Sequence, residues 1–67
     1  MDHLAGYFEV DKGRFESALV RRSDRTVIAY THGDEVIVTV SGLGIYDNAD
    51  RKAVVAYAEQ YDLSIRW

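Results

Sequence analysis

The sequence has no cysteine and no proline, and its 67 residues include only two histidines, His3 and His32. Small domains often gain stability from disulfide bonds or from a structural zinc ion, and both depend on cysteine or on several histidines. Neither device is available to this chain. We therefore expect its stability to come from a well-patterned apolar core or from burial against a second chain.

Long apolar runs are also missing, since nowhere do about 18 apolar residues follow one another. Residues 1–4 contain no basic region, and no apolar run follows them, so a signal peptide is not expected. We expect a cytoplasmic protein with no membrane partner. An apolar content of 48% is too high for a disordered chain. The length allows one domain only, which predicts a single small domain over residues 1–67.

An alternation of apolar and polar residues with a period of two runs through the first two thirds of the chain. It predicts four strands, at residues 6–10, 14–22, 25–31 and 35–41, which the short turns between them would pair in antiparallel fashion. From about residue 46 the period becomes helical. Asp47 is expected to cap this helix, and Asp50 to lie favourably in its first turn. Its apolar stripe would consist of Ala53, Val54, Tyr57, Ala58 and Tyr61.

The last five residues, 63–67, alternate again and predict a final short strand. The expected fold is therefore of the α+β class: a twisted antiparallel sheet of four to five strands in the order ββββαβ. The single helix packs on one face of this sheet.

One register gathers the apolar residues of the sheet on one side. It takes Ser23-Asp24 as a two-residue loop and lets Gly33 end a three-residue loop. The predicted core face then consists of Phe8, Val10, Phe15, Leu19, Ile28, Tyr30, Val36, Val38 and Val40.

The opposite face is also apolar in this register. Its centre consists of Ala18, Val20, Val27, Ala29 and Ile37, extended by Tyr7, Thr31 and Thr39, with Glu9, Glu16, Arg22 and Glu35 around it. One helix covers only one face of a sheet. The second face must therefore be covered by curling of the sheet into a partial barrel, by a second copy of the chain, or by a partner.

Motifs for chemistry are incomplete. Gly42-Leu43-Gly44 lies where a dinucleotide-binding turn would lie, but Asp47 replaces the third small residue and Asp50 would repel a phosphate. Asp47, Asn48 and Asp50 lack the alternate spacing of a calcium loop, and His32 with Asp34 offers too few ligands for zinc. We assign no catalytic, cofactor-binding or metal-binding residue, and we expect no enzyme activity.

Charge is segregated along the chain, which has a formal net charge of −3. Residues 12–25 hold five basic and two acidic residues, whereas residues 26–50 hold no lysine or arginine. A surface with an apolar centre and a charged rim is typical of protein-binding sites. The predicted partner-binding residues are Tyr7, Val20, Arg22, Arg25, Val27 and Ile37.

The leading hypothesis is a non-enzymatic protein-binding module, either an inhibitor or an adaptor, that acts by occupying a partner's surface. A short, cysteine-free, acidic chain is typical of small phage and mobile-element proteins, which include anti-CRISPR proteins and other inhibitors of host enzymes. This analogy rests on size and composition alone. It makes a nucleic-acid-handling enzyme one candidate partner.

Two alternatives stay open. The first is a single-stranded nucleic-acid binder that uses Arg21, Arg22, Arg25 and exposed tyrosines, although the negative net charge disfavours direct binding of nucleic acid. The second is a homodimer in which the apolar faces of two copies meet.

Overall fold

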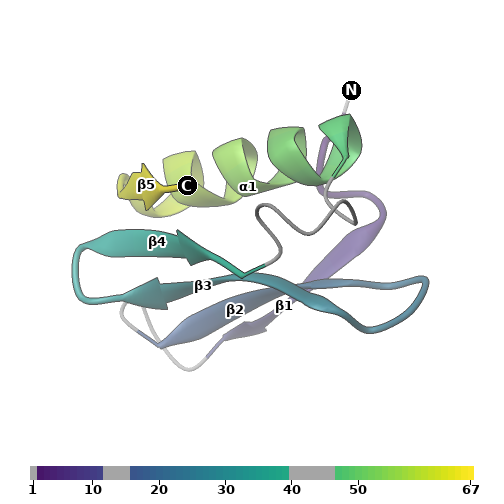
Figure 1. The fold of residues 1–67 in the computed structure, drawn as a ribbon, viewed down its shortest axis with the longest axis horizontal. Coiled ribbons are helices and arrows are strands. Elements are labelled where there is room, and N and C mark those ends of the chain that lie inside the picture. The colour runs from purple at the N-terminus through teal and green to yellow at the C-terminus, as the bar shows by residue number, and fades with distance from the viewer. Residues whose placement is uncertain (1, 12–15, 40–46) are drawn as a thin grey trace.

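The computed structural model describes residues 2–11, 16–39 and 47–67. Their strands form one sheet in the order β1-β2-β3-β4-β5, antiparallel except for the parallel pair β4–β5. α1 lies along one side of this sheet (Figure 1). The predicted α+β class and ββββαβ order are confirmed. In chain order the elements are β1 (Tyr7–Asp11), β2 (Ser17–Arg21), β3 (Val27–His32), β4 (Glu35–Val38), α1 (Asn48–Tyr61) and β5 (Ser64–Arg66).

The ends of α1 are set by aspartates. The Asp47 side chain accepts a hydrogen bond from the Asp50 amide at 2.9 Å, and the Asp50 side chain accepts one from the Asp47 amide, which completes a capping box. This confirms the predicted helix start. At the other end Asp62 adopts a left-handed φ of 57°, and the Leu63 amide bonds the Ala58 carbonyl at 3.0 Å. The chain thereby reverses into β5 within two residues.

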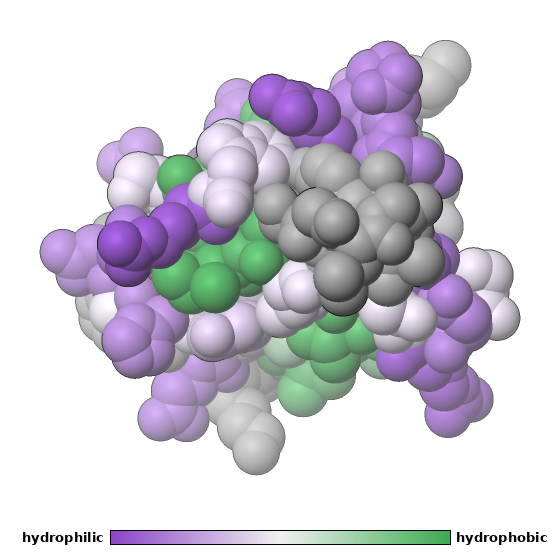
Figure 2. Space-filling view, in the orientation of Figure 1, coloured by the Kyte–Doolittle hydropathy of each residue, from purple (hydrophilic) through white to green (hydrophobic). Residues whose placement is uncertain are grey.

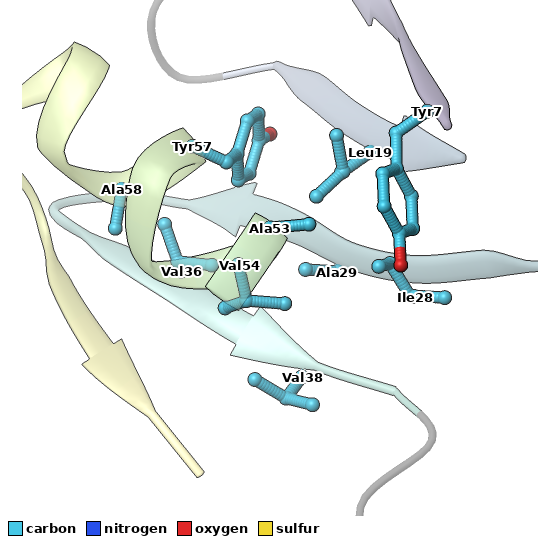
Figure 3. Close-up of a cluster of buried hydrophobic side chains, with 10 residues drawn as sticks. All are labelled: Tyr7, Leu19, Ile28, Ala29, Val36, Val38, Ala53, Val54, Tyr57 and Ala58. Carbon is cyan, nitrogen blue, oxygen red and sulfur yellow. The ribbon is translucent and has the colours of Figure 1, made fainter. Parts of the chain in front are cut away.

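The core lies between α1 and the sheet, and Figure 3 shows its side chains meeting there. From α1 come Ala53, Val54, Tyr57 and Ala58, the first four residues of the predicted stripe, while Tyr61 is partly buried beside them. The sheet contributes Tyr7, Leu19, Ile28, Ala29, Val36 and Val38. Tyr57 is fully buried because its hydroxyl finds a partner in the Ser17 hydroxyl at 2.6 Å.

The predicted register between the second and third strands is correct at the loop and wrong beyond it. Val20 pairs with Val27, as a loop centred on Ser23-Asp24 requires, but Leu19 pairs with Ala29. Ile28 is thus the extra residue of a β-bulge. A bulge changes which side the following residues face, so Ala29 and Thr31 enter the core side instead of the second face.

The turn between β3 and β4 is also shorter than predicted. Gly33, with φ of 62°, and Asp34 form a two-residue turn in which His32 pairs with Glu35. In this register Tyr30 pairs with Ile37 and faces away from α1. The prediction that Tyr30 belongs to the core is therefore wrong, whereas Ile28, Val36 and Val38 are buried as predicted.

The faces of β1 are exchanged relative to the prediction. Tyr7 pairs with Arg21 and is buried on the helix side, whereas Phe8 pairs with Val20 and faces away from α1, as does Val10. The Tyr7 hydroxyl reaches a buried carboxylate on α1, which a phenylalanine side chain could not bond. Predictions for Phe15, Val40 and Gly42-Leu43-Gly44 lie outside the described residues.

Candidate functional site

The side of the sheet away from α1 is apolar across four strands, and we call it the open face. Two cross-strand rows build it. One row runs through Phe8, Val20 and Val27, and the other through Val10, Ala18, Tyr30 and Ile37. In the part of the chain that the structure describes, no helix or second sheet lies over these two rows.

The open face is exposed at its periphery and shielded at its centre. Val10 is 45% exposed, Val27 42% and Tyr30 38%, whereas Val20, which pairs with both Phe8 and Val27, is only 5% exposed. Figure 2 shows hydrophobic residues on the lower side of the molecule, where the sheet faces away from α1. Exposed apolar residues grouped in this way on a small domain are typical of a surface that contacts another molecule.

Five of the six predicted partner-binding residues lie on or beside the open face. Val20, Val27 and Ile37 belong to its two rows, and Arg22 follows directly after β2 with its guanidinium over the Phe8 ring. Arg25 lines a hollow together with Phe8 and Arg22. Tyr7 does not belong to this group, because its side chain lies in the core on the opposite side of the sheet.

Sequence reasoning missed three members of the open face, namely Phe8, Val10 and Tyr30. A pattern of period two shows that Phe8 and Val10 share a side of β1 but not which side that is. Tyr30 changes sides because of the bulge at Ile28. Tyr7 is the residue from which the sequence could have indicated that Phe8 faces away from the core. It lies one residue from Phe8 and carries a hydroxyl that suits a polar partner at the edge of a core.

The charged residues around the open face are mainly basic. Arg22 and Arg25 lie at one end, and Arg66, the cross-strand neighbour of Ile37, ends the edge strand β5. Glu35 also lies on this side, with its carboxylate 3.9 Å from Arg66, and the exposed Glu16 directly precedes β2. The chain as a whole has a net charge of −3, so its acidic excess is concentrated away from these arginines.

A buried ionic cluster lies on the other side of the sheet, at the start of α1. Asp50, 1% exposed, accepts a hydrogen bond from the Tyr7 hydroxyl at 2.6 Å and one from Arg21 Nε at 3.2 Å. Arg21 Nη2 bonds the second carboxylate oxygen, and Arg21 Nη1 bonds Asp24 at 2.8 Å. Asp50 therefore joins α1 to two neighbouring strands as well as completing the helix cap.

The charge states of this cluster follow from its contacts. Burial alone would raise the pKa of Asp50, but the hydrogen bonds from Arg21 and Tyr7 outweigh it and hold that pKa below its usual value. Burial, followed by the hydrogen bond to Asp50, raises the pKa of the Tyr7 hydroxyl. At neutral pH the carboxyl is thus ionised and the phenol is protonated, an arrangement that holds helix and sheet together.

A hollow of about 570 Å³ adjoins this cluster and is lined in part by His3, Lys52 and Ala49. Its buried carboxylate is already bonded by Tyr7 and Arg21, so it offers little capacity to a ligand. Residues 2–11, 16–39 and 47–67 contain no group of three or more side chains suited to hold a metal ion. The same ranges contain no helix with the length and apolar character needed to span a membrane.

Comparison of the chain with protein-family models, with curated proteins and with solved structures finds no match.

Proposed function

We propose that the chain is a non-enzymatic protein-binding module that acts by occupying the surface of a partner with its open face. The observation that carries this proposal is the apolar area of the open face, where Val10, Val27 and Tyr30 are exposed to water. Burial of such side chains supplies affinity, because each Å² of apolar area removed from water contributes roughly 25 cal/mol.

The basic rim indicates the chemistry of the partner. Arg22 and Arg25 lie together at one end of the open face, so an apolar patch flanked by acidic residues complements that end. Rim charges of this kind steer and orient the partner, while the apolar centre holds it. An inhibitor would block such a patch on an enzyme, including one that handles nucleic acid, and an adaptor would bridge it to another protein.

The test uses a matched pair of variants. Val27→Asp places a charge on the open face, and Val55→Asp places the same charge on the exposed side of α1, where Val55 is 37% exposed. Proteins captured by the wild-type chain from its source cells are purified and titrated against all three proteins. We expect Val27→Asp to weaken binding at least about 30-fold, the size of a strong interface residue, and Val55→Asp to leave it within about 3-fold.

Circular dichroism and urea unfolding of both variants verify that each stays folded. The proposal fails if purified candidate partners bind the two variants equally well, because the open face would then not be the contact. It also fails if no protein binds in a Val27-dependent manner while oligonucleotides bind the chain.

A second candidate function is single-strand nucleic-acid binding, which two aromatic residues on the sheet favour. Phe8 and Tyr30 both face away from α1, and Arg22 and Arg25 lie beside Phe8. Such binding neutralises phosphates, so its affinity for an oligonucleotide would fall steeply with added salt. Titration of a decathymidine at 50 and 200 mM NaCl separates this function from protein docking.

A further inference from the structure

The open face ends in a hollow of about 440 Å³ that is lined by Phe8, Arg22 and Arg25. The Arg22 guanidinium carbon lies 5.5 Å from the centre of the Phe8 ring, within the range of a cation–π contact. Phe8 begins the row that continues through Val20 and Val27. The hollow is therefore continuous with the apolar surface described above.

The backbone fixes the place of both arginines. The Arg22 amide bonds the Gly6 carbonyl at 3.0 Å, which extends the pairing of β1 with β2 by one residue. The Arg25 amide bonds the Arg21 carbonyl at 2.8 Å and closes the loop between β2 and β3. Arg25 also adopts a φ of 59°, a left-handed conformation that residues other than glycine and asparagine seldom take. The loop thus presents a long cationic side chain at a position where glycine would be easier to accommodate.

Neither arginine has an ionic partner in the part of the chain that the structure describes. The nearby carboxylate of Asp24 is used by the Arg21 guanidinium at 2.8 Å and by the Thr26 amide at 3.1 Å. Two cations consequently line one hollow to which the described residues bring no counterion. An anion placed between them would relieve their mutual repulsion and gain charge-assisted hydrogen bonds.

We propose that this hollow binds a carboxylate side chain from an acidic segment of the protein partner, whose neighbouring apolar residues pack on the exposed Val27. This inference rests on the proposed function and names the group that the docking surface recognises. A guanidinium stacked on an aromatic ring keeps its in-plane N–H groups available, and these match the two oxygens of a carboxylate.

The ring of Phe8 also argues against a nucleic-acid ligand. Single-strand binders stack bases on free aromatic faces, but Arg22 already lies over the Phe8 ring. Tyr30, the other aromatic residue of the open face, belongs to the second row. The residues that follow Phe8 across the sheet are valines, which suit the aliphatic side chains of a protein segment.

The test is an NMR titration of the isotopically labelled full chain with four probes. They are a hexapeptide of alternating glutamate and valine, the same peptide with glutamine for glutamate, decathymidine, and inorganic phosphate, each raised to about 10 mM where solubility allows. We expect the glutamate peptide to shift the Arg22 and Arg25 Nε–H signals and the Val27 amide. The Arg51 Nε–H signal, on α1, should not move, and the glutamine peptide should lose the effect.

Two double variants with the same change in net charge supply the control. Arg22→Gln with Arg25→Gln should weaken binding of the glutamate peptide at least about tenfold, the loss of roughly one charge-assisted bond. Arg51→Gln with Lys52→Gln removes the same charge from α1 and should change the affinity less than about threefold.

The inference is overturned if the glutamate peptide leaves the Arg22 and Arg25 signals unmoved, or if both double variants weaken it equally. It is also overturned if only decathymidine or phosphate shifts these signals, since the ligand would then be a phosphate. A captured protein whose binding depends on Val27 but not on the two arginines would leave the docking function in place and remove this site. If the glutamate peptide binds at the hollow but no protein partner depends on Val27, the carboxylate site stands and the docking function falls.

Discussion

At the scale of single residues, Asp50 combines two functions that are usually separate. Its backbone and side chain complete the N-terminal cap of α1, and its carboxylate receives Tyr7 and Arg21 from β1 and β2. A buried carboxylate is costly unless its hydrogen bonds are satisfied, and here each of its oxygens is bonded. The stability of the helix–sheet packing therefore depends strongly on this one side chain.

We predict that Asp50→Asn destabilises the protein by about 3 kcal/mol, because it leaves the Arg21 guanidinium without its buried partner. Urea unfolding followed by circular dichroism at 222 nm measures the change. Asp34→Asn, in an exposed turn, removes the same charge and should cost less than about 0.5 kcal/mol. An Asp50→Asn variant as stable as Asp34→Asn would contradict the part assigned to this cluster.

The same carboxylate makes stability depend on pH in the acid range. Its folded-state pKa lies below its unfolded value, so the native state binds fewer protons there and unfolding becomes easier as pH falls. The contribution of Asp50 is fully present above about pH 4, the usual range of an aspartate, and is lost as pH drops through the lower folded pKa. Urea unfolding at several pH values, with a carbon-13 NMR titration of the Asp50 carboxyl, measures both quantities.

Tyr7→Phe provides the comparison for this acid dependence, since it removes one of the hydrogen bonds that lower the Asp50 pKa. The carboxyl should then titrate at a higher pH than in the wild-type protein, and acid destabilisation should begin earlier. An Asp50 titration curve that is unchanged in Tyr7→Phe would show that this hydrogen bond does not set its charge.

At the scale of elements, the strands and the helix could be predicted from the sequence, but the faces of the strands only in part. The change from period two to a helical period places every element within a few residues of its observed bounds. The Asp47 cap follows from a local rule that needs no tertiary information. Residues 27–30, Val-Ile-Ala-Tyr, all tolerate a strand, so no local signal marks Ile28 as the extra residue of the bulge.

The candidate site shows the same limit. Val20 and Val27 could be assigned to one face because both precede the bulge. Ile37 lies on that face because the bulge and the shorter turn each shift the pairing, and the two shifts cancel. Phe8 could not, since its side of the sheet depends on the pairing of β1 with β2 and on where Tyr7 finds a polar partner. The contact between the Arg22 guanidinium and the Phe8 ring depends on the same pairing, so it could not be predicted from the sequence either.

The two-residue turn between β3 and β4 gives a prediction at this scale. Gly33 has a φ of 62°, and a Cβ there would meet no atom within 4 Å, so Gly33→Ala suffers only from the backbone conformation. We expect it to lower the free energy of unfolding by about 1 kcal/mol. Gly6 has equal space and no positive φ, so Gly6→Ala should change stability by less than about 0.5 kcal/mol. Thermal and urea unfolding of the two variants measure the difference, and equal effects would contradict the assigned turn.

At the scale of the whole molecule, one helix covers one face of a five-stranded sheet, and among the described residues no helix or second sheet covers the other face. For a domain of this length a free energy of unfolding of about 3–10 kcal/mol is expected from roughly 0.05–0.15 kcal/mol per residue. The chain therefore tolerates exposed Val10, Val27 and Tyr30 only because its core on the helix side is closely packed around Tyr57 and Leu19. An apolar surface kept under these conditions is better explained by a partner than by stability.

The oligomeric state of the purified chain distinguishes a second copy from another protein as the partner of the open face. Two open faces brought together would bring Arg22 and Arg25 of both copies to one interface, and neither arginine has an ionic partner among residues 2–11, 16–39 and 47–67. Like charges at this density oppose association of two copies, whereas an acidic partner gains from them. We predict that the purified protein sediments as a monomer in 150 mM NaCl. A protein concentration of about 10–100 μM is suitable, because weak homodimers form in roughly this range. Sedimentation equilibrium measures the mass directly. A dimer that Val27→Asp dissociates and Val55→Asp leaves intact would instead make a second copy the occupant of the open face.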